Sequence, residues 1–149
     1  MTTEMWEQKL REQYPNAKWM DDGQFGLGQV KNPDKPVTVT ATIVRKPWGY
    51  EVWHIFIDLY AWKTLVILSG KRFSKQLHIH KTETWLISSG QPLVTLGNES
   101  FTAKPGQLIH VPAATVHRIA AVGGDVELWE VSTPELDDVV RIEDDFSRT

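Results

Sequence analysis

The sequence predicts an all-β domain, a sandwich or barrel of antiparallel strands, with a short helical extension at its N-terminus. Short β-branched and aromatic runs recur along the chain, turn-forming residues separate them, and no helical pattern lies between them. The 149 residues, with a mass of 17.0 kDa, fit a single domain. We expect residues 1–36 to form the extension and residues 37–149 to form the barrel with its C-terminal tail.

The extension is expected to begin with one amphipathic helix over residues 3–14. Trp6, Leu10 and Tyr14 recur at every fourth position, which places their side chains on one face of a helix. A proline follows directly and ends the pattern. Residues 17–36 are rich in Gly, Asp, Asn and Pro, which is typical of irregular chain with at most one short strand.

Strands are predicted from residue 37 onward, because apolar and β-branched residues alternate or cluster there. Glycine, proline and asparagine separate these runs at turns. The expected strands cover residues 37–44, 50–57, 62–68, 85–87, 93–96 and 126–131. The acidic tail after residue 134 also carries apolar side chains, so we expect it to fold back onto the barrel.

Composition excludes several classes of function. The absence of cysteine rules out disulfides, thiolate metal sites and a cysteine nucleophile. A net charge of −3 and a pI of about 5.9 argue against nucleic acid or an anionic membrane as the main partner. No apolar run approaches the roughly 20 residues of a membrane-spanning helix, and no signal peptide is recognisable. We therefore expect a cytoplasmic protein.

Four residues have the types and the order of a metal site. His78 and His80 lie two residues apart, so on a strand their side chains share one face. Glu83 begins the next apolar run, and His117 follows a turn that can return the chain to the same end of a barrel. Two histidines on a strand can also be ordinary hydrogen-bonded residues, but the added carboxylate and third imidazole favour one divalent ion, Zn, Mn, Fe or Ni.

Residues 70–121 resemble the two conserved motifs of the cupin superfamily. The spacing before His78 is longer than in that pattern and the spacing before Glu83 is shorter. The resemblance implies a single-domain cupin, a double-stranded β-helix or jelly-roll barrel, that holds its metal on the four residues named above. The matching positions are His78, His80, Glu83, Gly90, Gly106, Pro112 and His117.

Within the cupins, the chain is more similar to type II mannose-6-phosphate isomerases. Three stretches carry this similarity: residues 45–50 (Arg-Lys-Pro-Trp-Gly-Tyr), residues 70–85, and residues 140–148 with the sequence Arg-Ile-Glu-Asp near their start. The family's three consecutive histidines are here His78-Ile79-His80. The resemblance implies a metal-dependent aldose–ketose isomerase that acts on a sugar or a sugar phosphate, whereas residues 1–44 do not match.

Such an isomerase needs a proton carrier beside the metal, because it moves a proton between adjacent sugar carbons through an enediolate. His110 and Glu130 are the candidates, since each lies on an expected barrel strand. Gln76 has the same strand parity as His78 and is expected to face the ion or its waters.

A sugar phosphate also needs cationic groups that hold its phosphate. The cations near the motifs are Arg72, Lys75, Arg118 and Arg141. Arg118 and Arg141 are favoured, because the resemblance places an arginine at both positions, and Arg118 directly follows a predicted metal ligand.

Two other functions stay open at this point. An Fe(II) dioxygenase of the cupin type uses a closely similar set of three histidines and one glutamate, and its turnover would depend on oxygen. A non-catalytic carbohydrate-binding cupin would bind sugar without exchanging its protons.

The run from Tyr50 to Trp62 also predicts assembly. It carries apolar residues on both faces, which is unusual for a hairpin with one solvated side. We expect a homodimer that buries part of this surface.

Overall fold

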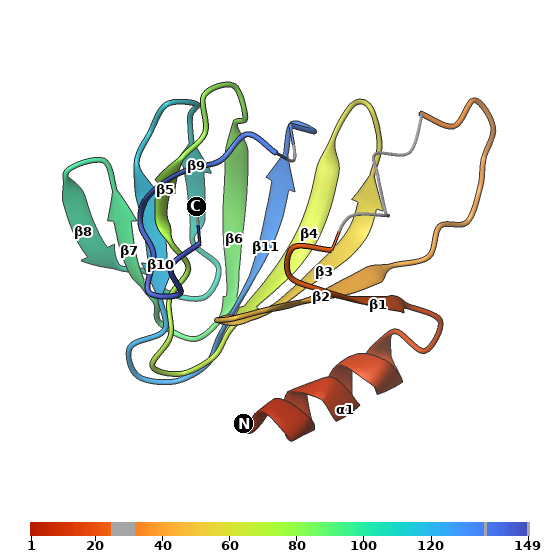
Figure 1. The fold of residues 1–149 in the computed structure, drawn as a ribbon, viewed down its shortest axis with the longest axis horizontal. Coiled ribbons are helices and arrows are strands. Elements are labelled where there is room, and N and C mark those ends of the chain that lie inside the picture. Colours follow the sequence, from red (N-terminus) through yellow and green to blue (C-terminus); the bar gives the residue numbers. More distant parts are fainter. Residues whose placement is uncertain (25–31, 136, 149) are drawn as a thin grey trace.

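The computed structural model describes residues 1–24, 32–135 and 137–148. Within these residues the chain forms one helix and short strands arranged in two sheets (Figure 1). The elements are α1 (Thr3–Gln13), β1 (Lys18–Asp21), β2 (Thr42–Lys46), β3 (Gly49–Phe56), β4 (Ala61–Ile67), β5 (Lys75–Leu77), β6 (Glu83–Ser89), β7 (Leu93–Leu96), β8 (Glu99–Thr102), β9 (Leu108–Val111), β10 (His117–Ala120), β11 (Val126–Ser132) and β12 (Val140–Glu143).

The seven-stranded sheet has the order β1-β2-β3-β4-β11-β6-β9, and the five-stranded sheet has the order β12-β5-β10-β7-β8. Neighbouring strands are antiparallel, except that β1 runs parallel to β2. The strand order departs from the chain order because β11 inserts between β4 and β6. The predicted all-β architecture is therefore confirmed, and sequence-distant strands lie side by side.

The main core lies between the two sheets. Trp85 and Ile87 on β6, Leu128 on β11 and Ile119 on β10 are almost completely buried and belong to one cluster. Strand β6 alternates strictly, with Glu83, Trp85 and Ile87 on its buried side. The same alternation that builds the core therefore turns the first residue of β6, a glutamate, towards the barrel interior.

Helix α1 covers the outer face of the larger sheet. Trp6 and Leu10 pack with Tyr50, Val52 and Val66 in a second core, and the Thr2 hydroxyl caps the helix by accepting the backbone N–H of Met5 at 3.1 Å. The predicted helix is confirmed to within one residue. Burial on both faces explains why these strands are apolar throughout.

The predicted homodimer stays a prediction. Part of the apolar surface that suggested it is covered by α1 within the same chain. Leu59, Tyr60 and Trp62 nevertheless remain exposed at the other end of the hairpin.

The strand expected over residues 37–44 is wrong in its first half. Strand β2 begins at Thr42, and its partners β1 and β3 pair with it only from that residue onward. Val37 and Val39 are exposed. β-Branched residues favour extended backbone, but a strand also needs a neighbour that accepts its hydrogen bonds. The irregular segment expected over residues 17–36 contains β1, and residues 25–31 of it lie outside the described part.

The C-terminal tail folds back, as expected, and its strand β12 pairs with β5. Phe146 packs against the main core. Arg148 donates hydrogen bonds to Asp144 at 2.8 and 3.1 Å. The tail thus closes the barrel beside β5. In the described part of the chain, no helix is long and apolar enough to cross a membrane.

Candidate functional site

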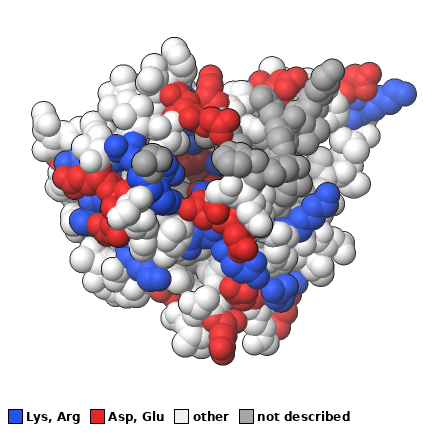
Figure 2. All heavy atoms as spheres, in the orientation of Figure 1, with Lys and Arg blue, Asp and Glu red and all other residues white. Residues whose placement is uncertain are grey.

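A cavity of about 660 Å³ opens into the barrel between the sheets. Figure 2 shows acidic and basic side chains gathered around a hollow in this face of the molecule. Among the described residues, equal numbers of basic and acidic side chains line the cavity. The basic ones are Lys46, Lys63, Lys81, Arg141 and Arg148, and the acidic ones are Asp22, Glu51, Glu83, Glu130 and Asp137.

Three predicted metal ligands meet in the barrel, and we call them the histidine cluster: His78, Glu83 and His117. All three are buried, and one potential ligand atom from each lies within 4.8 Å of the others. The Nε2 atom of His117 is 3.1 Å from Glu83 Oε1, and that of His78 is 3.8 Å from Glu83 Oε2. They come from the end of β5 and the first residues of β6 and β10.

Backbone carbonyls set the proton position on both rings. His78 Nδ1 lies 2.5 Å from the carbonyl oxygen of Asp138, and His117 Nδ1 lies 2.9 Å from that of Thr115. A carbonyl oxygen only accepts, so each Nδ1 carries a hydrogen, and each ring turns its Nε2 towards Glu83. Neither Nε2 has a hydrogen-bond partner among the described residues.

This arrangement fits a bound cation. Two imidazole nitrogens and a carboxylate converge in a buried space, and these are donor types that divalent ions bind in proteins. Histidine ligands of metals commonly donate their other ring N–H to a carbonyl or carboxylate, as both rings do here. His78, Glu83 and His117 therefore have the donor types and the orientation that a divalent ion requires.

His80 is not part of this cluster, which corrects the expectation that it shares a face with His78. Strand β5 ends at Leu77, so strict alternation no longer applies two residues later. The His80 side chain is exposed, and its backbone N–H donates to the Asp138 carboxylate at 2.6 Å. The structure thus brings together two histidines and one glutamate.

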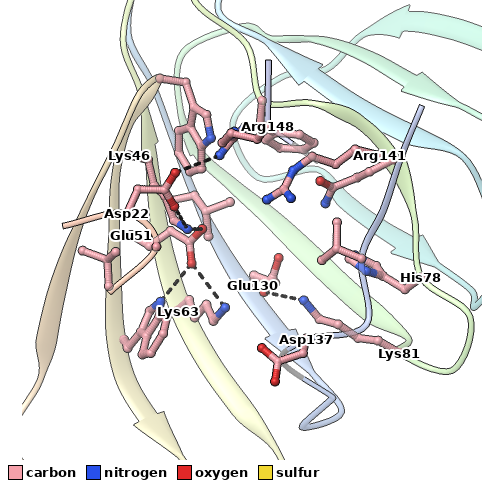
Figure 3. A pocket seen from close by; sticks show the side chains of 18 of the residues that line it. Asp22, Lys46, Glu51, Lys63, His78, Lys81, Glu130, Asp137, Arg141 and Arg148 are labelled. Carbon is pink, nitrogen blue, oxygen red and sulfur yellow. Dashed lines mark hydrogen bonds and ion pairs between the residues drawn. The ribbon is translucent and has the colours of Figure 1, made fainter. Parts of the chain in front are cut away.

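Lys81 enters the site in place of His80, and the sequence analysis missed it. Its Nζ lies 3.1 Å from Glu83 Oε2 and 3.5 Å from Glu130 Oε2, and the side chain is buried. In Figure 3, Lys81 and Glu130 point towards each other inside the cavity. No periodic pattern marks a residue in a connection between strands, so the sequence offered no signal for its burial.

The charges shift the pKa values of the buried groups. Burial opposes ionisation of Glu83, but the positive charge of Lys81 outweighs it and holds the pKa of Glu83 well below its usual range. Burial raises the pKa of Glu130 to about 7, and the negative charge of Glu83 adds to this effect. Burial, followed by the charge of Lys81, lowers the pKa of His78 and favours its neutral ring.

A second buried polar group lies on the larger sheet, and we call it the Glu51 cluster: Lys46, Glu51, Trp53 and Lys63. Glu51 Oε1 accepts from Lys63 Nζ at 3.2 Å and from Trp53 Nε1 at 2.9 Å, and Lys46 lies 3.8 Å from Oε2. Burial opposes the charge of Glu51, but the two lysines hold its pKa well below its usual range. Strand alternation could have revealed Lys63, because Leu65 and Ile67 on the same strand are buried at its parity.

Of the two candidate proton carriers, only Glu130 lies in the cavity. It sits on the inward side of β11 with Leu128 and Ser132. His110 is on the outer side of β9, where its Nδ1 is 3.0 Å from Thr84 Oγ1 and its side chain is exposed. Ile109 and Val111 occupy the buried positions of that strand, so alternation excludes His110 from the site.

Gln76 and Arg141 line the cavity from the paired strands β5 and β12, where they are direct neighbours across the ladder. Arg148, which the sequence analysis noted only as part of the closing motif, lines it too. Figure 3 shows Arg141 and Arg148 together on one side of the cavity. Arg148 pairs with Asp144 at 2.8 Å and with Asp22 at 3.4 Å, so two carboxylates balance its charge.

The other expected cations lie elsewhere, which corrects their assignment to the phosphate. Arg118 is buried on the opposite face of β10 from His117, where it donates to the carbonyls of Phe73 and Glu143 at 2.9 and 3.1 Å. Arg72 is exposed and pairs with Asp145 at 2.8 Å. Lys75 is not among the described residues that line the cavity.

Two facing antiparallel sheets with a histidine cluster between them define a cupin barrel, the double-stranded β-helix. A solved double-stranded β-helix domain protein of Klebsiella pneumoniae has this fold: the TM-score is 0.53 at 19% sequence identity, and the match covers 58% of this chain and 76% of that one. A family model described as mannose-6-phosphate isomerase C-terminal matches residues 33–144, and the chain belongs to this family.

Two curated relatives have the same degree of identity to the chain. A mannose-1-phosphate guanylyltransferase of Salmonella muenchen is 33% identical over 105 residues, which are 67% of this chain and 22% of that protein. The alginate biosynthesis protein AlgA of Pseudomonas aeruginosa is 33% identical over 113 residues, which are 71% of this chain and 23% of that protein. The chain thus spans less than a quarter of the length of these relatives, and the first is named for nucleotidyl transfer rather than isomerisation.

Proposed function

We propose that this chain acts as a metal-dependent aldose–ketose isomerase on a sugar or a sugar phosphate. The observation that carries the proposal is geometric: a histidine cluster with the donors of a metal site lies close to Glu130, a second buried carboxylate that faces the cavity. The family description, mannose-6-phosphate isomerase C-terminal, supports the substrate class.

The metal ligands of this proposal are His78, Glu83 and His117. These three residues would hold a divalent ion, whose positive charge would stabilise negative charge on a sugar oxygen. Zn, Mn, Fe and Ni all accept this mixture of nitrogen and oxygen donors. The carbonyls of Asp138 and Thr115 fix both rings in the tautomer that such binding requires.

Glu130 is the proposed proton carrier. A general base works best when its pKa lies close to the working pH, and burial raises that of Glu130 to about 7. Its carboxylate faces the cavity 3.5 Å from Lys81. In this position it can take a proton from one carbon of a bound sugar and return it to the neighbouring carbon.

Arg141 is the proposed anchor for a phosphate, and Gln76 is the proposed partner of a sugar hydroxyl. Both line the cavity from adjacent strands, with Gln76 on the strand that ends beside His78. A guanidinium recognises phosphate through paired hydrogen bonds.

Proton exchange tests the proposed reaction. Metal-loaded protein incubated with mannose 6-phosphate in D₂O should place deuterium at C2, which proton NMR detects as loss of the C2 signal. Glu130→Gln should reduce the exchange rate by about 100-fold, because the carbonyl oxygen of an amide is a far weaker base. Binding of the sugar without any exchange would contradict isomerisation and favour the carbohydrate-binding alternative.

The anchor is tested by comparing two arginines. Arg141→Ala should lower kcat/KM by about 100-fold for the phosphorylated sugar and by far less for the free sugar. Arg72→Ala is the matched control, since its charge is exposed and paired with Asp145, and it should leave both values within about twofold. Equal losses on both sugars would remove Arg141 from the phosphate role.

A second candidate function follows from the donor set. Two histidines and one carboxylate with open positions are also the ligands of non-haem Fe(II) oxygenases. Consumption of oxygen by the Fe(II)-loaded chain in the presence of a substrate would favour that reaction. Exchange of sugar protons in the absence of oxygen would exclude it as the explanation of that activity.

A further inference from the structure

The most unusual feature of the site is a lysine, Lys81, that lies beside the three proposed metal ligands without being one of them. The connection between β5 and β6 is held by Asp138, whose carboxylate accepts the backbone N–H groups of Ile79, His80 and Lys81 at 2.9, 2.6 and 2.9 Å. This bonding places the His80 side chain in solvent and the Lys81 side chain in the cavity. The chain thus presents an ammonium group where the sequence suggested a third imidazole.

The ammonium group shares a ligand with the proposed metal ion. Lys81 Nζ is 3.1 Å from Glu83 Oε2, and the side chain of Glu83 is only 2% exposed. A divalent ion that binds Glu83 meets this positive charge at close range and with little water to screen it. Lys81 already balances the negative charge that would otherwise attract the ion.

Glu130 gives Lys81 an alternative partner. Its Oε2 lies 3.5 Å from the same Nζ, so the ammonium group stands between two carboxylates. When an ion takes Glu83, the charge of Lys81 can still be balanced by Glu130 inside the barrel. Without that second carboxylate, a metal ion would leave a buried lysine unpaired, which is costly.

We propose that Lys81 is a built-in cation of this centre that competes with a divalent metal ion for Glu83, and that Glu130 weakens this competition by pairing with Lys81. The inference rests on the proposed metal centre. The affinity for metal then depends on five side chains. Three of them are the proposed ligands, His78, Glu83 and His117, and the other two are Lys81 and Glu130.

Calorimetric titration of the full chain with Zn²⁺, and separately with Mn²⁺, tests the competition. Lys81→Met keeps the length of the side chain and removes its charge, so it should bind either ion about tenfold more tightly than the wild type. Lys81→Arg keeps the charge and should stay within about threefold of the wild type. Lys46→Met is the matched control, because it removes a cavity lysine that pairs with Asp22 at 2.8 Å, and it should also stay within about threefold.

Glu130→Gln gives a change of opposite sign. In the wild-type background it should weaken metal binding by about threefold or more, because Lys81 then pairs with Glu83 alone. In the Lys81→Met background the same substitution should have no effect beyond about twofold. An equal loss in both backgrounds would show that Glu130 attracts the ion directly, and this would overturn its proposed action through Lys81.

The outcomes distinguish a failure of the proposed competition from a failure of the proposed metal centre. Metal uptake with equal affinity in wild type, Lys81→Met and Lys81→Arg overturns the competition and leaves the metal centre intact. No uptake by any of the three overturns the metal centre itself, and the competition with it. Uptake by Lys81→Met alone supports the competition. Circular dichroism of each variant establishes that folded proteins are being compared.

Discussion

The two buried polar clusters in this barrel contain the same kind of group but differ in how it is balanced. Glu83 is buried and Glu51 is largely buried, and neighbouring cations hold the pKa values of both carboxyl groups well below the usual range. In the Glu51 cluster, two lysines and an indole N–H satisfy the carboxylate. In the histidine cluster, two ring nitrogens face a carboxylate and have no hydrogen-bond partner among the residues described.

The way in which the polar atoms are satisfied indicates which of the two clusters is a binding site. The amount of charge does not distinguish the clusters, because each glutamate has a lysine ammonium group within about 3.2 Å. The distinction lies in donor atoms whose lone pairs converge without a hydrogen to share. On this criterion the Glu51 cluster is part of the framework, and the histidine cluster is the place for an added cation.

The greatest change in stability is expected from a substitution in the Glu51 cluster. Lys63→Met removes the ammonium group 3.2 Å from Glu51. The largely buried carboxylate of Glu51 then has only Lys46, at 3.8 Å, to balance its charge. The free energy of unfolding should fall by about 3 kcal/mol or more, as measured by urea denaturation. Arg72→Ala, which breaks an exposed ion pair with Asp145, should change it by about 1 kcal/mol or less. A Lys63 variant as stable as the Arg72 variant would contradict a structural role for the Glu51 cluster.

The second effect concerns the two histidines of the motif. His78→Ala removes a donor that faces Glu83 and should weaken binding of Zn²⁺ by about 100-fold. His80→Ala removes only an exposed side chain and should change the affinity by less than about threefold. Calorimetric titration measures both. Comparable losses would show that His80 enters the centre after all, and would remove the distinction drawn from its exposure.

The smallest effect concerns the residue that supports the histidine cluster from outside. Asp138→Ala removes the acceptor of three backbone N–H groups and loosens the segment whose carbonyl orients His78. Binding of Zn²⁺ should weaken by about tenfold, the usual effect of losing an indirect support. Asp145→Ala, on the exposed part of the same tail, is the control and should bind as the wild type does. No difference between the two would show that His78 keeps its orientation without Asp138.

Much of this site was predictable from local patterns. Glu83 is the first residue of β6, and Glu130 lies within β11. In each strand the buried apolar residues lie an even number of positions from the glutamate, so alternation turns both glutamates inward. The spacing of the two cupin motifs placed His78 and His117 together. Lys63 follows the same rule of parity and was overlooked, although a charged residue at a core position is itself an informative signal.

The rest depends on contacts between distant residues. His80 leaves the site because β5 stops at Leu77, and Lys81 enters it because Asp138 fixes the connection from 57 residues further along the chain. Arg118 is drawn to the carbonyl of Glu143, a residue of the C-terminal strand. Patterns of period two cannot report such bonds, because they describe a strand and not the segment that packs on its end.

The bonds to Asp138 also bear on how the site opens. The amide hydrogens of Ile79 and His80 are bonded although the side chains of both residues reach solvent, so their exchange with water follows detachment of the C-terminal segment rather than exposure. Detachment frees these amides together with the ring N–H of His78 and breaks the pairing of β12 with β5, while the seven-stranded sheet keeps its ladder. The geometry of the histidine cluster can therefore be lost in a local opening that requires less free energy than unfolding of the barrel.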